Sequence, residues 1–338
     1  MEIHKEKIAD IYFDPEFSKL YEQIEGGKTE QFLFENEYGS VSHTFIRRPI
    51  SLPVDGRQYY DLVTAYGYGG PYVCEVLTPE GETQESAKEK LLSGFAESYR
   101  TYCEENHVVS EFVRFHPLMH NADDFKELFH VEYLRNTVGT DLKAYPDFMA
   151  QEYSRRCRKN INQALRKGIT AEVVEAPENL DEFEQIYYAT MDRNNAADYY
   201  YFEDDYFKKC LELYRDHILL VKAIYEGKTI AAGFYFVWGK TVHIHLSGTL
   251  SDYLFLSPAY ILRYAVTKWA SENGIELIHH GGGRSNDPED SLFKFKKQFG
   301  EHTEFPFCVG KKIWNRDIYE RLCEGCADTD FFPAYRQR

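Results

Sequence analysis

The chain has 338 residues, 43% hydrophobic and 28% charged, which is the composition of an ordinary globular protein with room for two domains. Its 55 acidic residues outnumber the 39 basic ones, and the formal charge of −16 excludes a protein that coats DNA with its whole surface. No run approaches the roughly 18 apolar residues of a membrane span, so we expect a cytoplasmic protein without such a span. The seven cysteines are scattered, so we expect reduced thiols and no metal site.

The first half of the chain predicts strands, then a helix, then a strand. Aromatic and β-branched residues punctuated by Gly and Pro predict the strands at residues 31–39, 41–50 and 59–70. Apolar residues at helical spacing predict a helix over 86–106, and a strand follows at 110–117.

The second half repeats this order with little sequence identity. It predicts strands at 217–227, 229–239 and 241–249, a helix over 258–274 that ends at Gly274, and a strand at 275–283. The repetition predicts an α/β protein with mixed sheets, built from two copies of one unit.

A helix predicted over residues 152–168 is a basic island in an acidic protein. Arg155, Arg156 and Lys159 lie near its start, where free backbone N–H groups also favour an anion. The island is either a solvated helix face or a site for the phosphates of a ligand.

Residues 180–216 predict two helices around an aromatic turn that includes Tyr199 and Tyr201. The turn is either packing or the wall of a binding site.

The stretch from His279 to Gly300 joins a glycine hinge to a short helix that begins near Asp290. At about 100° per residue, Lys296 falls on the apolar side of this helix. A buried cation needs a partner or a function. We expect Lys296 to face a cleft, with Gly282 and Gly283 letting the chain turn back toward it.

A glycine-rich turn at residues 66–71 offers backbone groups without obstructing side chains. It consists of Tyr66, Gly67, Tyr68, Gly69, Gly70 and Pro71. The turn either lies close to an extended ligand or ends a strand where positive φ is required.

Several of these segments, taken in order, resemble the FemAB family of peptidyltransferases. They are the turn at 66–71, RFHP at 114–117, the basic helix at 154–168, the aromatic turn at 199–202, HLSGT at 245–249, and the glycines 281–283 followed by DSLFKFKKQFG at 290–300. Members of that family have two tandem GNAT-like domains and transfer an amino acid from aminoacyl-tRNA to a peptidoglycan precursor.

The resemblance implies a first GNAT-like domain over residues 1–147, with 311–338 packing back on it, and a second over 148–310 that holds the donor. It implies that Lys296 steadies negative charge on the donor and on the transfer intermediate, and that Phe295 lines the donor channel. The basic residues near Arg155 would lie close to the acceptor's phosphates. The chain departs from the better-known members in having no coiled-coil insertion, which puts tRNA use in doubt.

Three hypotheses remain open. The first is an aminoacyl or acyl transferase acting on an amine of a phosphorylated, nucleotide-linked or sugar-linked acceptor, with aminoacyl-tRNA as co-substrate. The second is an acyl-CoA N-acyltransferase, although residues 249–260 lack the glycine-rich basic loop that usually holds the CoA pyrophosphate. The third is a non-catalytic ligand-binding protein. For the general base the candidates are His116, His245 and His280, or a substrate phosphate or water.

Overall fold

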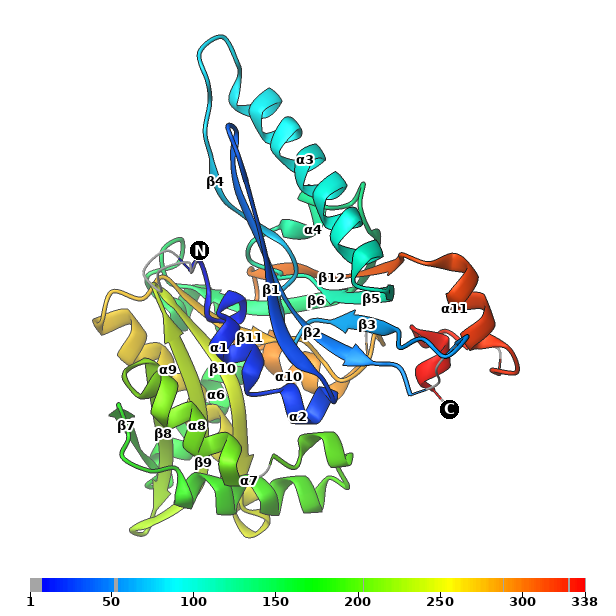
Figure 1. The fold of residues 1–338 in the computed structure, drawn as a ribbon. Helices are drawn as coiled ribbons and strands as arrows, with labels where there is room; N and C mark the ends of the chain where they lie inside the picture. Colours follow the sequence, from blue (N-terminus) through cyan, green and yellow to red (C-terminus); the bar gives the residue numbers. More distant parts are fainter. Residues whose placement is uncertain (1–7, 52–53, 203, 288, 328, 338) are drawn as a thin grey trace. The chain divides into compact units, whose positions relative to one another are not determined.

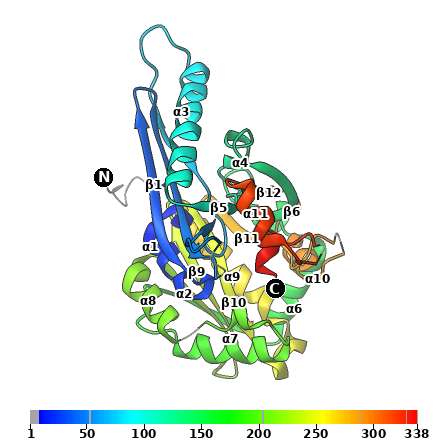
Figure 2. The same ribbon diagram turned by 45° about the vertical axis from the view of Figure 1, so that its right-hand side comes forward.

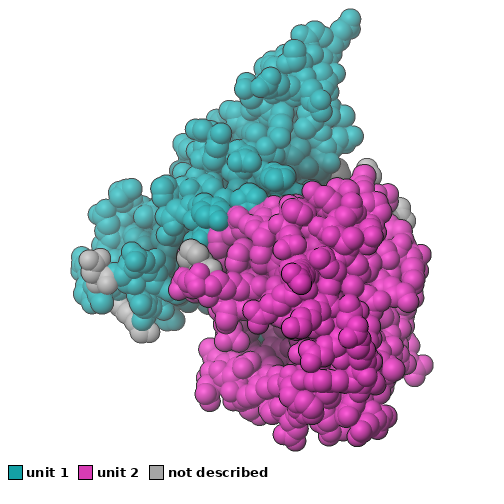
Figure 3. Space-filling model, turned by 180° about the vertical axis from the view of Figure 1, so that it is seen from behind, with its two compact units in different colours: residues 1–134, 306–338 teal, residues 135–305 magenta. Residues whose placement is uncertain are grey.

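The computed structural model describes residues 8–51, 54–202, 204–287, 289–327 and 329–337. It divides into two compact units, unit 1 with residues 1–134 and 306–338 and unit 2 with residues 135–305 (Figure 3). The chain passes between the units inside strands β6 (His130–Asp141) and β12 (Glu304–Ile313). The boundaries expected from the sequence fell after these points, at residues 147 and 310.

In unit 1 the strands follow the order β1-β2-β3-β5-β12, and β4 also pairs with β2. Figure 1 shows the long helix α3 beside β1 and β4. The elements are β1 (Lys28–Asn36), β2 (Gly39–Pro49), β3 (Tyr60–Val63), β4 (Tyr72–Val76), α3 (Gln84–Glu105), β5 (Val108–Arg114), the short helices η2 (Ile11–Phe13), α1 (Pro15–Lys19), α2 (Glu22–Glu25) and α4 (Asn121–Asp124), and the C-terminal α11 (Arg316–Cys323) and η6 (Ala334–Arg336).

The core of unit 1 lies between α3 and its sheet. Thr83 caps α3 by accepting a hydrogen bond from the Ser86 N–H, and the helix then buries one stripe. That stripe consists of Ala87, Leu91, Phe95, Tyr99 and Cys103. Strand β3, helix α3 and the parallel strand β5 form a β-α-β crossover, as the predicted order requires.

In unit 2 the order is β6-β11-β10-β9-β8-β7, and β10, α9 and the parallel strand β11 form the equivalent crossover. Figures 1 and 2 both show α9 beside the strands of this sheet. The elements are α5 (Phe148–Gln151), α6 (Arg155–Arg166), β7 (Thr170–Glu175), α7 (Asp181–Arg193), η3 (Asp198–Tyr200), α8 (Asp204–Tyr214), η4 (Arg215–His217), β8 (Ile218–Tyr225), β9 (Lys228–Trp238), β10 (Thr241–Thr249), η5 (Ser251–Leu256), α9 (Pro258–Glu272), β11 (Leu277–Gly281) and α10 (Ser291–Lys297).

Helices cover both faces of the sheet in unit 2. Alternate residues of β8 separate the faces: Leu219 and Val221 belong to the core under α6 and α9. On the other side Phe183 of α7 and Phe207 of α8 contact Phe234 of β9. Strands covered on both faces consist of nearly continuous apolar residues, which is why β8 and β9 could be predicted from the sequence.

Among the described residues, no helix has both the length and the apolar character needed to cross a bilayer.

Candidate active site

Lys296 lies on α10 and faces inward, as helical spacing predicts. Asp290 caps the helix by accepting a hydrogen bond from the Phe293 N–H at 2.8 Å. The half-buried Lys296 side chain donates from Nζ to the Gly282 carbonyl at 2.7 Å. Among the described residues it has no carboxylate within ion-pair distance. The glycine hinge and the lysine predicted from the sequence therefore meet in one place.

The electrostatic surroundings of Lys296 weaken its affinity for a proton. Burial, followed by the nearby guanidinium of Arg263, lowers the Lys296 pKa to about 7, and Arg135 acts in the same direction while Asp290 opposes it. Near neutral pH the side chain thus has access to both the amine and the ammonium form. Perturbation of this kind is common where a lysine takes part in chemistry.

An aromatic wall adjoins this lysine. The Phe295 ring meets the Tyr260 ring edge-on, with centroids 5.1 Å apart, and meets the Phe299 ring at 5.3 Å. The Tyr260 hydroxyl donates to Gln298 Oε1 at 3.1 Å. Phe295 was predicted to line a donor channel, and that role stays a prediction.

The loop before α10 folds tightly around the Asp290 carboxylate. Its Oδ2 accepts hydrogen bonds from the backbone N–H groups of Arg284 and Ser285, each at 3.0 Å. A Cβ on Gly283 would lie 2.6 Å from Asp290 Oδ1, so this position excludes any side chain. Arg135 holds the same turn by donating to the Gly283 carbonyl at 2.9 Å.

The Asp290 cap makes the stability of this loop depend on pH. Hydrogen bonds from three backbone N–H groups outweigh burial and lower the Asp290 pKa to about 2. A lowered folded-state pKa stabilises the native state above the unfolded value of about 3.9, and this stabilisation is lost as pH falls toward 2. We expect Asp290→Ala to cost about 1 kcal/mol at pH 7. Urea unfolding should show this difference shrinking between pH 5 and pH 3; a difference independent of pH would contradict the assignment.

Two of the three histidines predicted as bases lie in unit 2 and are neutral. His245 hydrogen-bonds through Nε2 to the Tyr206 hydroxyl at 2.7 Å, and burial, followed by His243, lowers its pKa to about 3. His280 is fully buried with Nε2 at 2.8 Å from Thr140 Oγ1, and burial holds its pKa well below the usual value. Each is thus a weak proton acceptor.

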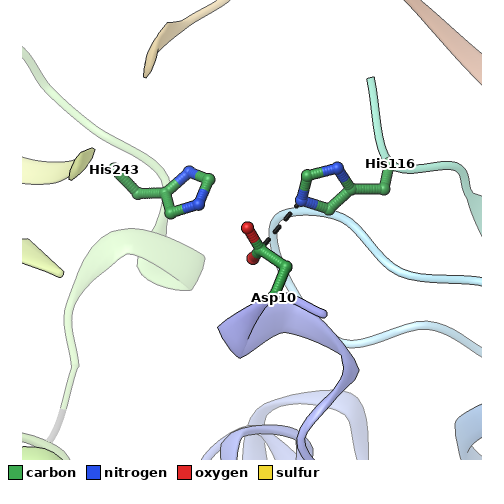
Figure 4. A group of neighbouring side chains, drawn as sticks. All are labelled: Asp10, His116 and His243. Carbon is green, nitrogen blue, oxygen red and sulfur yellow. Dashed lines mark ion pairs between the residues drawn. The ribbon is translucent and has the colours of Figure 1, made fainter. Parts of the chain in front are cut away.

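The third histidine, His116, lies in unit 1 with the glycine-rich turn. Asn121 joins the two by donating to the Gly69 carbonyl at 2.8 Å and accepting from the His116 N–H at 2.9 Å. Figure 4 shows His116 beside Asp10, with 3.4 Å between Nε2 and Oδ1. The Tyr68 ring lies 5.6 Å from the His116 ring. Sequence reasoning did not find Asn121 or Asp10.

The turn at 66–71 has the positive φ angles that its structural interpretation, the end of a strand, requires. Gly67 and Gly70 have φ of +100° and +86°, values that side chains rarely adopt. A Cβ on Gly67 would lie 2.4 Å from the Tyr12 ring, and one on Gly70 would lie 2.7 Å from Val113. The Tyr66 ring lies 5.9 Å from the Tyr21 ring. The role of this turn in binding a ligand stays a prediction.

The basic residues of α6 project from the start of the helix. Arg155, Arg156 and Lys159 are exposed, and none has a hydrogen-bond or ion-pair partner among the residues that the structure describes. Ser154 caps the helix by accepting from the Cys157 N–H at 3.0 Å. A hollow of about 440 Å³ opens here, lined by Ser154, Phe293, Lys294, Lys297, Gln298, Glu301 and His302.

Tyr199 and Tyr201 lie on the turn between α7 and α8. The Tyr201 ring stacks on Tyr188 with centroids 6.3 Å apart, and its hydroxyl donates to Asp192 at 3.0 Å. The Tyr199 ring meets Tyr200 edge-on at 5.7 Å. These contacts give the turn a packing function, and its use as a binding wall stays a prediction.

Sequence reasoning missed Arg263, whose guanidinium lies 4.7 Å from the Phe295 ring centroid. A signal was available: at about 100° per residue, Arg263 falls on the buried face of α9 with Val266 and Ala270. The same spacing argument identified Lys296.

Comparison with known proteins supports a transferase class. Residues 155–297 match the family model described as "Acetyltransferase (GNAT) domain". A UDP-N-acetylmuramoylpentapeptide-lysine N(6)-alanyltransferase from Weissella viridescens is 24% identical over 187 residues, a match spanning 54% of this chain and 54% of that protein. The chain thus spans about half the length of this curated relative.

Solved structures show the same fold. The crystal structure of FemX superposes with a TM-score of 0.68 at 14% identity, covering 95% of this chain and 98% of FemX. The C-terminal domain of a putative lysylphosphatidylglycerol synthetase from Agrobacterium fabrum gives a TM-score of 0.54 at 16% identity, covering 92% of this chain and 90% of that one. The chain therefore has the FemX fold, and its predicted similarity to FemAB-type transferases is confirmed.

Proposed function

We propose that the protein transfers an aminoacyl or acyl group to an amine of a phosphorylated or nucleotide-linked acceptor of the peptidoglycan-precursor type. The observation that carries this proposal is Lys296, a half-buried cation without a carboxylate partner among the described residues, held beside a glycine hinge. An enzyme that forms an amide must stabilise the oxyanion that develops on the donor carbonyl. Lys296 can do so because no carboxylate among the described residues forms an ion pair with it.

The acceptor follows from chemistry that α6 supplies. The exposed Arg155, Arg156 and Lys159 stand at a helix start, where phosphate oxygens find both N–H groups and cations. The alanyltransferase relative is named for a UDP-linked pentapeptide and for N(6) of its lysine, which is an amine on a phosphorylated carrier. This agreement supports the same acceptor class here.

The donor is proposed to be an aminoacyl-tRNA. In a conventional GNAT domain, a glycine-rich loop before the helix holds the CoA pyrophosphate. Here η5 (Ser251–Leu256) occupies the equivalent segment and contains no glycine. Ser257 follows it, and Pro258 is the first residue of α9. The GNAT-domain match keeps acyl-CoA as a second candidate, since it covers residues 155–297.

A thermal-shift series tests the proposed substrates. A ligand that binds the folded chain raises its melting temperature, by an amount that grows with concentration over Kd. We expect shifts with UDP-N-acetylmuramoylpentapeptide and with alanyl-tRNA. A shift with acetyl-CoA alone would overturn the aminoacyl-tRNA proposal in favour of acyl-CoA. No shift with any of the three would favour another acceptor or a binding protein without activity.

Charge reversal on α6 tests the acceptor site. We expect the double variant Arg155→Glu and Arg156→Glu to raise KM for the UDP-linked acceptor at least about tenfold with little change in kcat, because a lost charge-assisted contact to phosphate weakens binding by about 1.5–3 kcal/mol. The matched control is Arg166→Glu, at the other end of the same helix. An equal effect from the control would mean that the charges act through the general field of the protein.

A further inference from the structure

Arg263 is a buried cation that forms no ion pair with any of the residues that the structure describes. It is 3% exposed, and its guanidinium lies over the rings of Phe295 at 4.7 Å and Phe299 at 5.5 Å. Its Nε is buried without a hydrogen-bond partner, and among the described residues no carboxylate pairs with it. The aromatic faces offset part of the cost of burying this charge.

Two neighbouring positive charges repel each other strongly where little water screens them, so one of the two groups tends to become neutral. An arginine in protein stays protonated, whereas a buried lysine readily loses its proton. Of the two side chains, Lys296 is therefore the one that loses its proton. The other groups facing Lys296 do not reverse this outcome: His280 on β11 is neutral, Arg135 on β6 adds positive charge, and the Asp290 oxygens already accept hydrogen bonds from the backbone.

We propose that Lys296 in its amine form is the general base for the attacking acceptor, and that Arg263 is a positioning residue that holds Lys296 in that form. The proposal rests on the proposed transfer reaction and adds a second task to Lys296. The geometry supports it, since one N–H of Lys296 is directed at the Gly282 carbonyl at 2.7 Å. That bond fixes the nitrogen while its lone pair stays available.

The proton and electron balance is complete without another reactant. The acceptor arrives as an ammonium and gives one proton to the Lys296 amine. Its nitrogen lone pair then forms the C–N bond to the donor carbonyl carbon, and the C=O π electrons become an oxyanion beside the newly formed Lys296 ammonium. When the carbonyl re-forms, the ester C–O bond breaks, and the leaving oxygen takes the remaining surplus proton from the nitrogen. Lys296 finally returns its proton to solvent.

The alternative is that Arg263 is a structural support that packs between aromatic rings. Stability does not separate the two interpretations, because replacing Arg263 with methionine removes cation–π contacts and the cost of burying a charge together. They differ in what happens to the protonation of Lys296, which a structural role has no reason to change.

Competitive acetylation of the full chain separates them. Acetic anhydride is applied in trace amounts from pH 5 to pH 10, and the modification of Lys296 is measured by mass spectrometry with the exposed Lys294 as internal reference. We expect wild-type Lys296 to titrate with a midpoint near 7, the lowered pKa given by its surroundings. Arg263→Met should raise the midpoint by about one unit or more, which means at least about fivefold less amine at pH 7. Arg263→Lys should raise the midpoint as well, because a buried lysine loses the proton that the guanidinium keeps.

The pH dependence of transfer then tests the catalytic role. With alanyl-tRNA and UDP-N-acetylmuramoylpentapeptide as probes, the rate of Arg263→Met should be at least about fivefold lower than that of the wild type at pH 7 and should recover toward wild type near pH 9. A defect independent of pH would overturn the positioning role. If Lys296 titrates like Lys294 in the wild type, the base assignment fails, and this result needs no folded variant. If Lys296 titrates near 7 but transfer is absent, the proposed function fails instead.

Discussion

Replacing Lys296 with alanine is expected to lower turnover at least about 100-fold while leaving the melting temperature nearly unchanged. Loss of one preorganised oxyanion donor typically lowers kcat by about 100- to 1,000-fold. The side chain contributes little to stability because, among the described residues, it makes one hydrogen bond, to the Gly282 carbonyl, and because burial lowers its pKa. Single-turnover transfer rates and thermal unfolding, measured on the same preparation, check both parts of the prediction.

The matched control lies two residues away on the same helix. Lys294 is exposed and pairs with Glu289, so Lys294→Ala removes an ammonium from α10 without touching the hinge. We expect turnover within about twofold of wild type, since exposed ion pairs contribute little. If Lys296→Ala and Lys294→Ala lost activity equally, the net charge of α10 would matter and the position of Lys296 would not. If Lys296→Ala lost stability and activity in parallel, Lys296 would be structural.

Helical periodicity was enough to predict the central feature of the site. At about 100° per residue, Lys296 falls on the same side of this short helix as the apolar residues, so its inward direction follows from helical spacing. The glycines before it were predictable for the same local reason, because a hinge requires small residues. The order of strands and helices in each half could also be predicted, because each element has its own local pattern of apolar residues.

The residues that surround Lys296 could not be predicted from the sequence, because they come from segments that are distant along the chain. Arg263 is 33 positions from Lys296, and its influence appears only when α9 and α10 pack together. Strand β12 was missed because Pro306 and Gly310 weaken the strand pattern, although the strand pairs with β5 in the sheet of unit 1. The unit boundary fell inside β6 and β12 for a related reason: a strand that runs from one unit into the next shows no linker composition.

The second large effect is expected at Glu111 on β5, a carboxylate that is 1% exposed in the core of unit 1. It accepts hydrogen bonds from the Tyr99 hydroxyl at 3.1 Å and the Trp314 indole N–H at 3.0 Å, and its Oε1 lies 2.6 Å from His43 Nε2. Three side chains from distant segments of the chain thus converge on one carboxylate. Burial, followed by the negative charge of Glu111, raises the pKa of Tyr99 well above its usual value, which keeps that hydroxyl a donor.

Glu111→Ala is expected to lower the free energy of unfolding by about 3–5 kcal/mol, because it leaves the buried His43 and Tyr99 and the half-buried Trp314 without their common partner and opens a cavity. Urea unfolding followed by tryptophan fluorescence measures this directly, since Trp314 is one of the three. Glu111→Gln is the matched control: it keeps the volume and one acceptor oxygen, so it should cost distinctly less. Equal losses from the two variants would show that the charge of Glu111 is what matters. A loss below about 1 kcal/mol for Glu111→Ala would mean that water replaces the carboxylate, and that this cluster does not hold α3 to its sheet.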